Sequence, residues 1–206
     1  MKHGVVTGFL FNLSVLVLCI LSGCSQTPGD AAVRGGHPQA GADLYLQEAE
    51  LGRADAAFKL GLLVSQGRVS GERFKTGTYW FKRACELGEP VGCHNVGVAY
   101  EYGSADGIKI DYAEAAKYYR IAAEKGYIGS QYNFGSMYSN NYLPPDDVQG
   151  YTWMLLAEKA ARACAKQELC KWILEDPPGH RTKLKTRLTE DQIKQAETLA
   201  SSWKPR

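Results

Sequence analysis

The chain has 206 residues, with 24 Lys and Arg against 22 Asp and Glu, so its formal net charge at pH 7 is only +2. This balance gives no electrostatic basis for binding nucleic acid, which requires a concentration of basic side chains. The length suits one domain of ordinary size and leaves no room for a second, catalytic domain beside it.

The chain begins with the pattern of a secretory signal. A short positively charged start is followed by residues 4–21, which carry no charged side chain. A retained transmembrane anchor is the alternative interpretation, because this run approaches the length that spans a bilayer. However, the sequence Leu-Ser-Gly-Cys at residues 21–24 resembles the bacterial lipobox, in which the cysteine is acylated before the signal is cut away. The resemblance implies that residues 1–23 are removed and that lipid on Cys24 anchors the protein to a membrane.

The residues after this cysteine bear on where the protein lies. In many Gram-negative bacteria an Asp at the next position retains a lipoprotein in the inner membrane, whereas this chain has Ser25. The resemblance therefore implies the periplasmic face of the outer membrane. Residues 25–42 are rich in Gly, Ala and Pro without an apolar period, which predicts that residues 24–42 form a lipidated, flexible tether. A coil of about 18 residues would span about 20–25 Å on average.

An internal repeat dominates the remainder of the chain. Gly52, Gly88 and Gly126 each end an apolar run, at separations of 36 and 38 residues, and another glycine follows each of them nine residues later. A fixed period of this size predicts stacked helix–loop–helix units. The first glycine of each unit is expected to end a helix, and the second to let a neighbouring helix approach closely. In this alignment Phe58, His94 and Tyr132 share one aromatic position.

The repeat pattern resembles that of Sel1-like repeats, which are related to tetratricopeptide repeats. The best copy contains Asp111, residues 115–119 with the sequence Ala-Ala-Lys-Tyr-Tyr, and residues 122–126 with the sequence Ala-Ala-Glu-Lys-Gly. The resemblance covers roughly residues 43–161 and implies an all-α solenoid of about three helix pairs. The whole domain is expected over residues 43–206, with an insertion at 162–187 and a capping helix at 188–203.

Four cysteines remain once Cys19 and Cys24 are set aside, namely Cys85, Cys93, Cys164 and Cys170. An even number in an exported protein predicts two disulfides. Three pairings are possible, and the short separations favour Cys85 with Cys93 and Cys164 with Cys170. The first pair would span the turn between two repeats. This placement of a disulfide resembles that in the cysteine-rich branch of the Sel1 family.

The sequence contains no recognisable catalytic or metal-binding motif. His94 occupies the shared aromatic position, and neither His37 nor His180 has an evident partner. Gly-x-Ser-x-Gly, His-Glu-x-x-His and phosphate-binding glycine loops are absent. We therefore expect no enzyme activity, cofactor or metal. A hydrolase acting on peptidoglycan or β-lactams, sometimes proposed for the cysteine-rich branch, stays an unfavoured alternative because it would need a nucleophile with a base.

The leading hypothesis is a periplasmic adaptor that binds a protein on the concave face of the solenoid. Large aromatic side chains anchor many protein interfaces. The predicted anchors lie at the ends of the first helices or in the loops that follow them: Tyr100, Tyr102, Tyr138 and Tyr142. An alternative within the same class is an immunity-type inhibitor of a lipase effector of type VI secretion, which some membrane-tethered Sel1-repeat lipoproteins resemble.

Basic side chains gather near the end of the chain, at Arg181, Lys183, Lys185 and Arg187. A solvated helix face is the favoured interpretation, and a patch for anionic lipid or a polyanion is the alternative.

Overall fold

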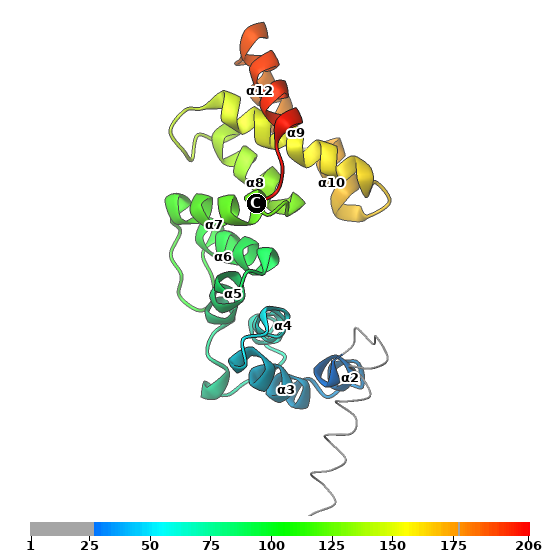
Figure 1. The fold of residues 1–206 in the computed structure, drawn as a ribbon. Helices are drawn as coiled ribbons and strands as arrows, with labels where there is room; N and C mark the ends of the chain where they lie inside the picture. The colour runs from blue at the N-terminus through cyan, green and yellow to red at the C-terminus, as the bar shows by residue number, and fades with distance from the viewer. Residues whose placement is uncertain (1–26, 177) are drawn as a thin grey trace, which may run out of the picture.

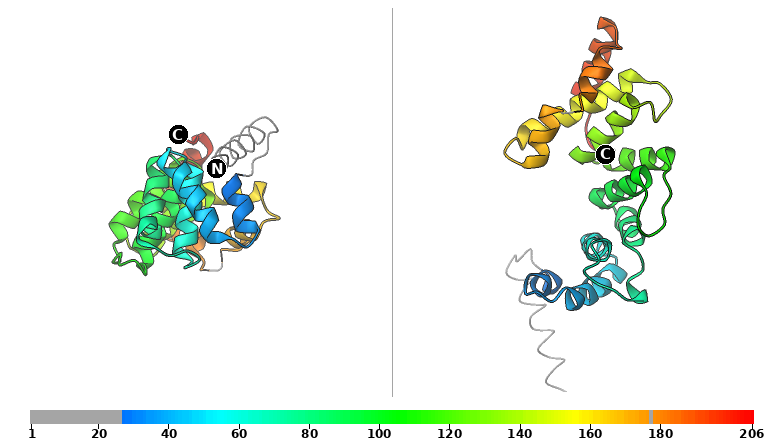
Figure 2. Two further views of the ribbon diagram at one scale, coloured as in Figure 1. Left: turned by 90° about the horizontal axis from the view of Figure 1, so that it is seen from below. Right: turned by 180° about the vertical axis from the view of Figure 1, so that it is seen from behind.

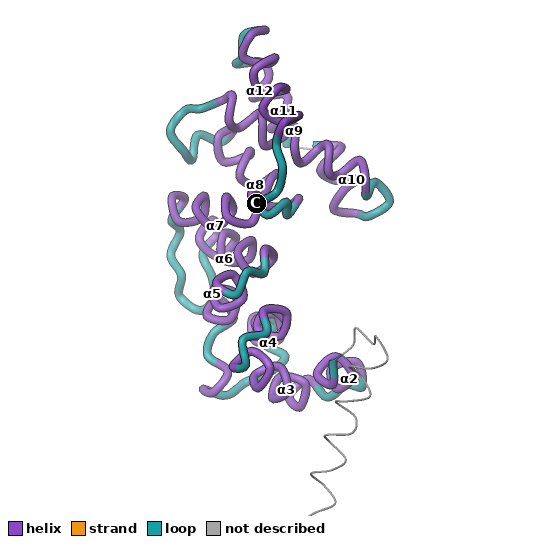
Figure 3. Tube along the Cα trace, viewed as in Figure 1, coloured by secondary structure: helices purple, strands orange, loops and turns teal. Residues whose placement is uncertain are grey.

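A computed structural model describes residues 27–176 and 178–206, which form helices and loops without a strand (Figures 1 and 3). The helices are α2 (Pro28–Arg34), α3 (Pro38–Glu50), α4 (Ala54–Ser65), the short 3₁₀ helix η1 (Glu72–Phe74), α5 (Gly77–Glu86), α6 (Pro90–Tyr102), α7 (Tyr112–Glu124), α8 (Ile128–Ser139), α9 (Asp147–Ala163), α10 (Glu168–Glu175), α11 (His180–Lys185) and α12 (Glu190–Ser202). The all-α prediction is confirmed.

Helices α4 and α5, α6 and α7, and α8 and α9 form three successive antiparallel pairs, and each pair packs on the next to build the predicted solenoid. A three-residue turn precedes each of these pairs, and Gly52, Gly88 and Gly126 in these turns have φ of 88°, 97° and 86°. Their amides bond back to the preceding helix, as Gly88 N does to Cys85 O at 3.0 Å. The glycines therefore end the helices in left-handed geometry, as the repeat pattern predicts.

The second glycine of each repeat lies where two helices of a pair touch. A Cβ atom on Gly97 of α6 would stand 2.6 Å from the ring of Tyr119 on α7. Gly61 meets Phe81 of α5 in the same way at 2.7 Å, and Gly135 meets Met154 of α9 at 3.1 Å. A side chain at these positions would clash, so the predicted packing role is correct.

The predicted flexible tether over residues 24–42 is wrong from Thr27 onward, because α2 and the first part of α3 occupy that stretch. Thr27 and Asp30 form a capping box at the start of α2. Gly29 of α2 lies beneath the ring of Tyr45 of α3, where an added Cβ would stand 2.4 Å away. This contact matches that of Gly97 with Tyr119. The helical domain therefore begins near Pro28, not at residue 43, and α2 with α3 forms an additional N-terminal pair.

The end of the chain departs from the repeat after α9. The insertion expected at residues 162–187 contains α10 and α11, which pack on α8 and α9, and α12 packs on α9 close to the predicted capping-helix position. Both α2 and α10 project from the same side of the stack, near its opposite ends (Figure 2). The insertion thus adds structure to the face of α8 that a regular solenoid would leave open.

Candidate partner-binding surface

The structure separates the four predicted anchor tyrosines into three environments. Tyr100 is half-buried, stacks on Tyr118 with ring centres 5.9 Å apart, and accepts a 3.0 Å hydrogen bond from Lys82 Nζ. That hydrogen bond raises the pKa of Lys82. These contacts join α5, α6 and α7, so Tyr100 contributes mainly to packing between repeats.

Tyr138 is also tied to the fold. Its hydroxyl donates to Gln149 Oε1 at 2.6 Å, and its ring meets Phe134 edge-on at 5.5 Å. A Cβ on Gly150 of α9 would stand only 2.7 Å from Tyr138 Cβ. Its role as a partner anchor stays a prediction, but its contacts hold α8 and α9 together.

The other two tyrosines lie in a cluster at the loop edge of the solenoid, called here the tyrosine edge, which consists of the exposed Tyr102, Ile110 and Tyr142 and the half-buried Tyr112. Tyr102 is 70% exposed and Ile110 is 57% exposed. Tyr142 stacks on Tyr112 with ring centres 4.0 Å apart and an interplanar angle of 3°. Partial burial, together with Glu101 and these neighbouring tyrosines, raises the pKa of Tyr102. The cluster joins the ends of two consecutive repeats.

Backbone contacts fix this edge in place. The main-chain amide of Asp111 donates to Tyr100 O at 2.8 Å, which folds the loop after α6 back on itself. The Asp111 carboxylate then accepts from the amides of Ala113 and Glu114, both at 3.0 Å, and caps α7. Beneath the edge, Tyr119 donates a 2.6 Å hydrogen bond to the buried carboxylate of Glu101. The exposed rings therefore rest on an ordered base.

A hollow of about 480 Å³ lies between α4, α5 and α6, and its lining includes Gly103, the residue that follows Tyr102. Phe81, Val98 and Ala99 form part of its apolar lining. At its rim, Asp106 accepts hydrogen bonds from the amide and hydroxyl of Thr78, both at 3.1 Å, and from Ser104. Partial burial raises the pKa of Asp106, but the hydrogen bonds from Ser104 and Thr78 outweigh it, so the net pKa is lowered. Lys75, also on the rim, has a left-handed φ of 55°.

The first helices do not form an open concave face along the whole stack. Helix α8 is buried over most of its length. Trp172 of α10 packs edge-on against Tyr132 at 4.9 Å, and His180 of α11 contacts Ser139. The insertion therefore covers the concave face at the third repeat, and the predicted groove is limited to the earlier repeats.

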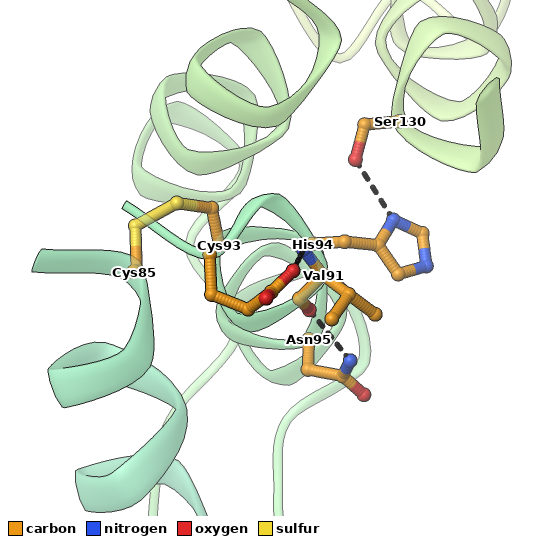
Figure 4. The surroundings of a disulfide bond; sticks show 7 residues. Cys85, Val91, Cys93, His94, Asn95 and Ser130 are labelled. Carbon is orange, nitrogen blue, oxygen red and sulfur yellow. Dashed lines mark hydrogen bonds between the residues drawn. A yellow bond between two sulfur atoms is a disulfide. The ribbon is translucent and has the colours of Figure 1, made fainter. Parts of the chain in front are cut away.

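Two histidine–serine pairs bear on the hydrolase alternative. His94 Nδ1 lies 2.9 Å from Ser130 Oγ (Figure 4), and His180 Nδ1 lies 3.1 Å from Ser139 Oγ. The members of each pair are 36 and 41 residues apart, so no local motif could reveal them. Both serines are 0% exposed, which keeps a substrate from reaching their hydroxyls. Within residues 27–206, excluding 177, no group of three His, Cys, Asp or Glu is placed to hold a metal ion.

The structure pairs the cysteines locally. Cys85 and Cys93 join α5 to α6 across a turn (Figure 4), and Cys164 joins the end of α9 to Cys170 in α10. Cys93 and Cys170 are buried. Disulfides persist in oxidising compartments, so these two indicate a location outside the cytoplasm. No helix in the described part of the chain is long and apolar enough to cross a bilayer. Cys24 lies outside the described residues.

The basic end of the chain is partly engaged in ion pairs. Arg181 pairs with Glu158 at 2.9 Å, and Arg187 pairs with Asp147 at 3.3 Å. Lys183 and Lys185 are exposed. Arg181 and Arg187 thus hold α11 and the residues after it against α9, whereas Lys183 and Lys185 match the favoured interpretation of a solvated face.

Comparison with known proteins agrees with this architecture. The Sel1 repeat model matches residues 54–89, 90–127 and 128–162, which together are more than half of the chain. No curated relative matches it. The structure resembles that of c5321, described as a protective antigen present in uropathogenic Escherichia coli strains and displaying an SLR fold, with a TM-score of 0.60 and 29% identity. That alignment covers 78% of this chain but only 32% of the antigen.

A Sel1 repeat protein from Oxalobacter formigenes has the same fold, with a TM-score of 0.61 and 21% identity over 84% of this chain and 69% of that protein. Sel1 repeats form scaffolds that typically bind proteins and are generally non-catalytic. The N-terminal pair of α2 and α3 lies outside the matched residues, although it packs like the three repeats. With three matched repeats and a solenoid of helix pairs, the chain belongs to the Sel1 repeat family.

Proposed function

We propose that this protein is an extracytoplasmic adaptor, anchored by lipid on Cys24, that binds a protein partner at the tyrosine edge. The exposure of Tyr102 beside the stacked rings of Tyr112 and Tyr142 carries this proposal. Aromatic side chains that are already held in place lose little conformational freedom on binding and frequently dominate interface energies. The neighbouring hollow offers apolar surface for a side chain of the partner.

This location modifies the hypothesis of a concave binding face. The insertion occupies the concave side of α8, whereas the exposed rings of Tyr102 and Tyr142 lie at the end of α6 and in the loop after α8. The partner surface is therefore centred on the loop edge of the second and third repeats, extending into the hollow beside α6. Outer-membrane attachment, on the periplasmic side, follows from the lipobox with Ser25 and is part of the same proposal.

Photo-crosslinking in cells tests the proposal. The full-length protein carries a benzophenone amino acid in place of Tyr102, and a matched variant carries it in place of Tyr79, which is 49% exposed on α5. We expect a discrete protein adduct from position 102 that is absent from position 79. Equal labelling at both positions, or no adduct at position 102, would contradict the proposed surface. A lipase recovered as the partner would identify the adaptor as an inhibitor.

A further inference from the structure

The turn between α3 and α4 exposes a large apolar side chain at the N-terminal end of the solenoid. Leu51 in this turn is 85% exposed. The equivalent residues of the next two turns are Leu87 and Lys125. Each side chain extends toward the glycine of the preceding turn and ends within 4.0 Å of a Cβ atom built on that glycine. Leu51 belongs to the first such turn in the described part of the chain, so no earlier turn among the described residues lies against it.

The chain enters the fold at this same end. The connection from α2 to α3 is short, so the two helices are antiparallel neighbours, and the start of α2 lies beside Tyr45, five residues before the end of α3. Ion pairs join the two places: Lys59 lies 2.9 Å from Asp30 in the first turn of α2 and 3.6 Å from Asp55, which pairs with Arg53 at 3.1 Å. Arg53 follows Leu51 by two residues.

Covalent geometry then limits the distance from this end to Cys24. Thr27 is the N-cap of α2, and its position is three residues beyond Cys24. An extended chain spans at most about 3.3–3.6 Å per residue, so three residues reach about 10 Å. This is about the diameter of one helix with its side chains. An acylated Cys24 cannot hold the N-terminal pair away from the bilayer as an 18-residue tether would.

We infer that the N-terminal pair lies directly on the lipid surface, with Leu51 in contact with the membrane interface and the α12 end of the solenoid directed away from it. The inference rests on the proposed acylation of Cys24. It assigns the lipid bilayer as the partner of the exposed turn and places the tyrosine edge above the membrane.

Charge does not drive this contact. Arg53 pairs with Glu48 at 3.7 Å as well as with Asp55, while Glu50 beside Leu51 is exposed. No excess of basic side chains is present at this turn, so anionic lipid is not required. The contact depends on the short connection to the lipid and on burial of Leu51, and it is expected to persist at high salt.

Depth-dependent quenching of a fluorophore tests the inference. The full lipidated protein, with Leu51→Cys labelled by a thiol-reactive dye, is reconstituted in phosphatidylcholine vesicles that contain a lipid-borne quencher. Leu199→Cys on α12, where Leu199 is 47% exposed, is the matched control. The remaining cysteines are acylated or paired in disulfides, so labelling is selective. We expect severalfold stronger quenching at position 51 than at position 199, in both low and high salt.

A variant with a longer connection between Cys24 and α2 supplies a second arm of this experiment. Inserting 20 Gly and Ser residues between Gln26 and Thr27 gives an average reach of about 25 Å and should abolish the difference between the two positions. Flotation with the vesicles separates the two proposals. A protein that does not float lacks the anchor, which overturns the proposed acylation and this inference together. A protein that floats but is quenched equally at positions 51 and 199 overturns the inference alone.

Discussion

Tyr132 of α8 donates a 2.7 Å hydrogen bond to Asp176, which follows α10 and is only 6% exposed. The same carboxylate accepts from the amides of His180 at 3.1 Å and Arg181 at 2.9 Å, at the start of α11. Asp176 therefore docks the insertion onto the third repeat while supporting the first turn of α11.

The Tyr132→Phe variant should lower the free energy of unfolding by about 1.5–3 kcal/mol, because it removes a hydrogen bond to a buried carboxylate. Chemical denaturation with the disulfides intact measures this change. Tyr151→Phe is the matched control, since the Tyr151 hydroxyl makes no hydrogen bond to protein among the described residues. Equal stability losses in the two variants would contradict the assigned role of the Tyr132–Asp176 contact.

The N-terminal pair is expected to depend on Gly29. A leucine in its place would collide with the Tyr45 ring, whereas Ala31→Leu on the exposed side of the same helix should be tolerated. We expect the Gly29→Leu variant to show rapid amide hydrogen exchange across residues 28–50 and fast tryptic cleavage after Arg34. Slow exchange in both variants would show that the pair does not rely on this packing.

The disulfide between α5 and α6 should contribute to stability. Replacing Cys85 and Cys93 together by Ala opens a loop with a sequence separation of 8 residues. The chain-entropy model then gives a loss of about 2–3 kcal/mol. Equilibrium denaturation of the double variant measures it. An unchanged unfolding midpoint at unchanged slope would contradict the prediction.

Acid should destabilise the fold through His94, whose pKa is lowered from 6.5 to about 4 by burial. The unfolded chain binds a proton at this side chain below pH 6.5, while the folded chain stays neutral until about pH 4. The stabilising contribution is therefore present above pH 6.5 and is lost as the pH falls through 4, by at most about 3 kcal/mol.

His94→Phe should flatten the dependence of stability on pH between 4 and 6.5, because it removes the titrating side chain. Phe is the replacement chosen, since it is the residue at the equivalent position of the first repeat. His37→Phe, at an exposed site, should leave that dependence as it is. Burial also lowers the pKa of His180, so a smaller slope is expected to persist. Identical pH profiles for wild type and His94→Phe would refute the assignment to His94.

The repeat period predicted the helix pairs, the turn glycines and the aromatic position because each repeat unit brings close neighbours in sequence together. The N-terminal pair was missed because Gly29 and Gly41, which pack closely between α2 and α3, are the same residue type that makes a linker flexible. The exposed role of Tyr102 and the packing role of Tyr138 were not distinguishable by sequence, since both occur at the ends of equivalent helices. The contact of Trp172 with Tyr132 depends on an insertion that has no repeat partner.

The basic end should affect binding less than the tyrosine edge does. Lys183 and Lys185 are exposed, so their charges act mainly on the rate of association and are screened by salt. Replacing both with Ala is expected to weaken partner binding modestly, and more at low ionic strength than at high. Complete loss of binding in this variant would place the partner on α11.

The affinity of the crosslinked partner for a Tyr102→Ala, Tyr142→Ala variant, measured by calorimetry beside Tyr79→Ala, tests the central claim most directly. Aromatic anchors commonly cost 2 kcal/mol or more on truncation, so we expect the double variant to bind at least about 30-fold more weakly. The helical circular dichroism signal should be unchanged, and Tyr79→Ala should bind as the wild type does. Wild-type affinity in the double variant, with an intact fold, would contradict the proposal that the tyrosine edge binds the partner.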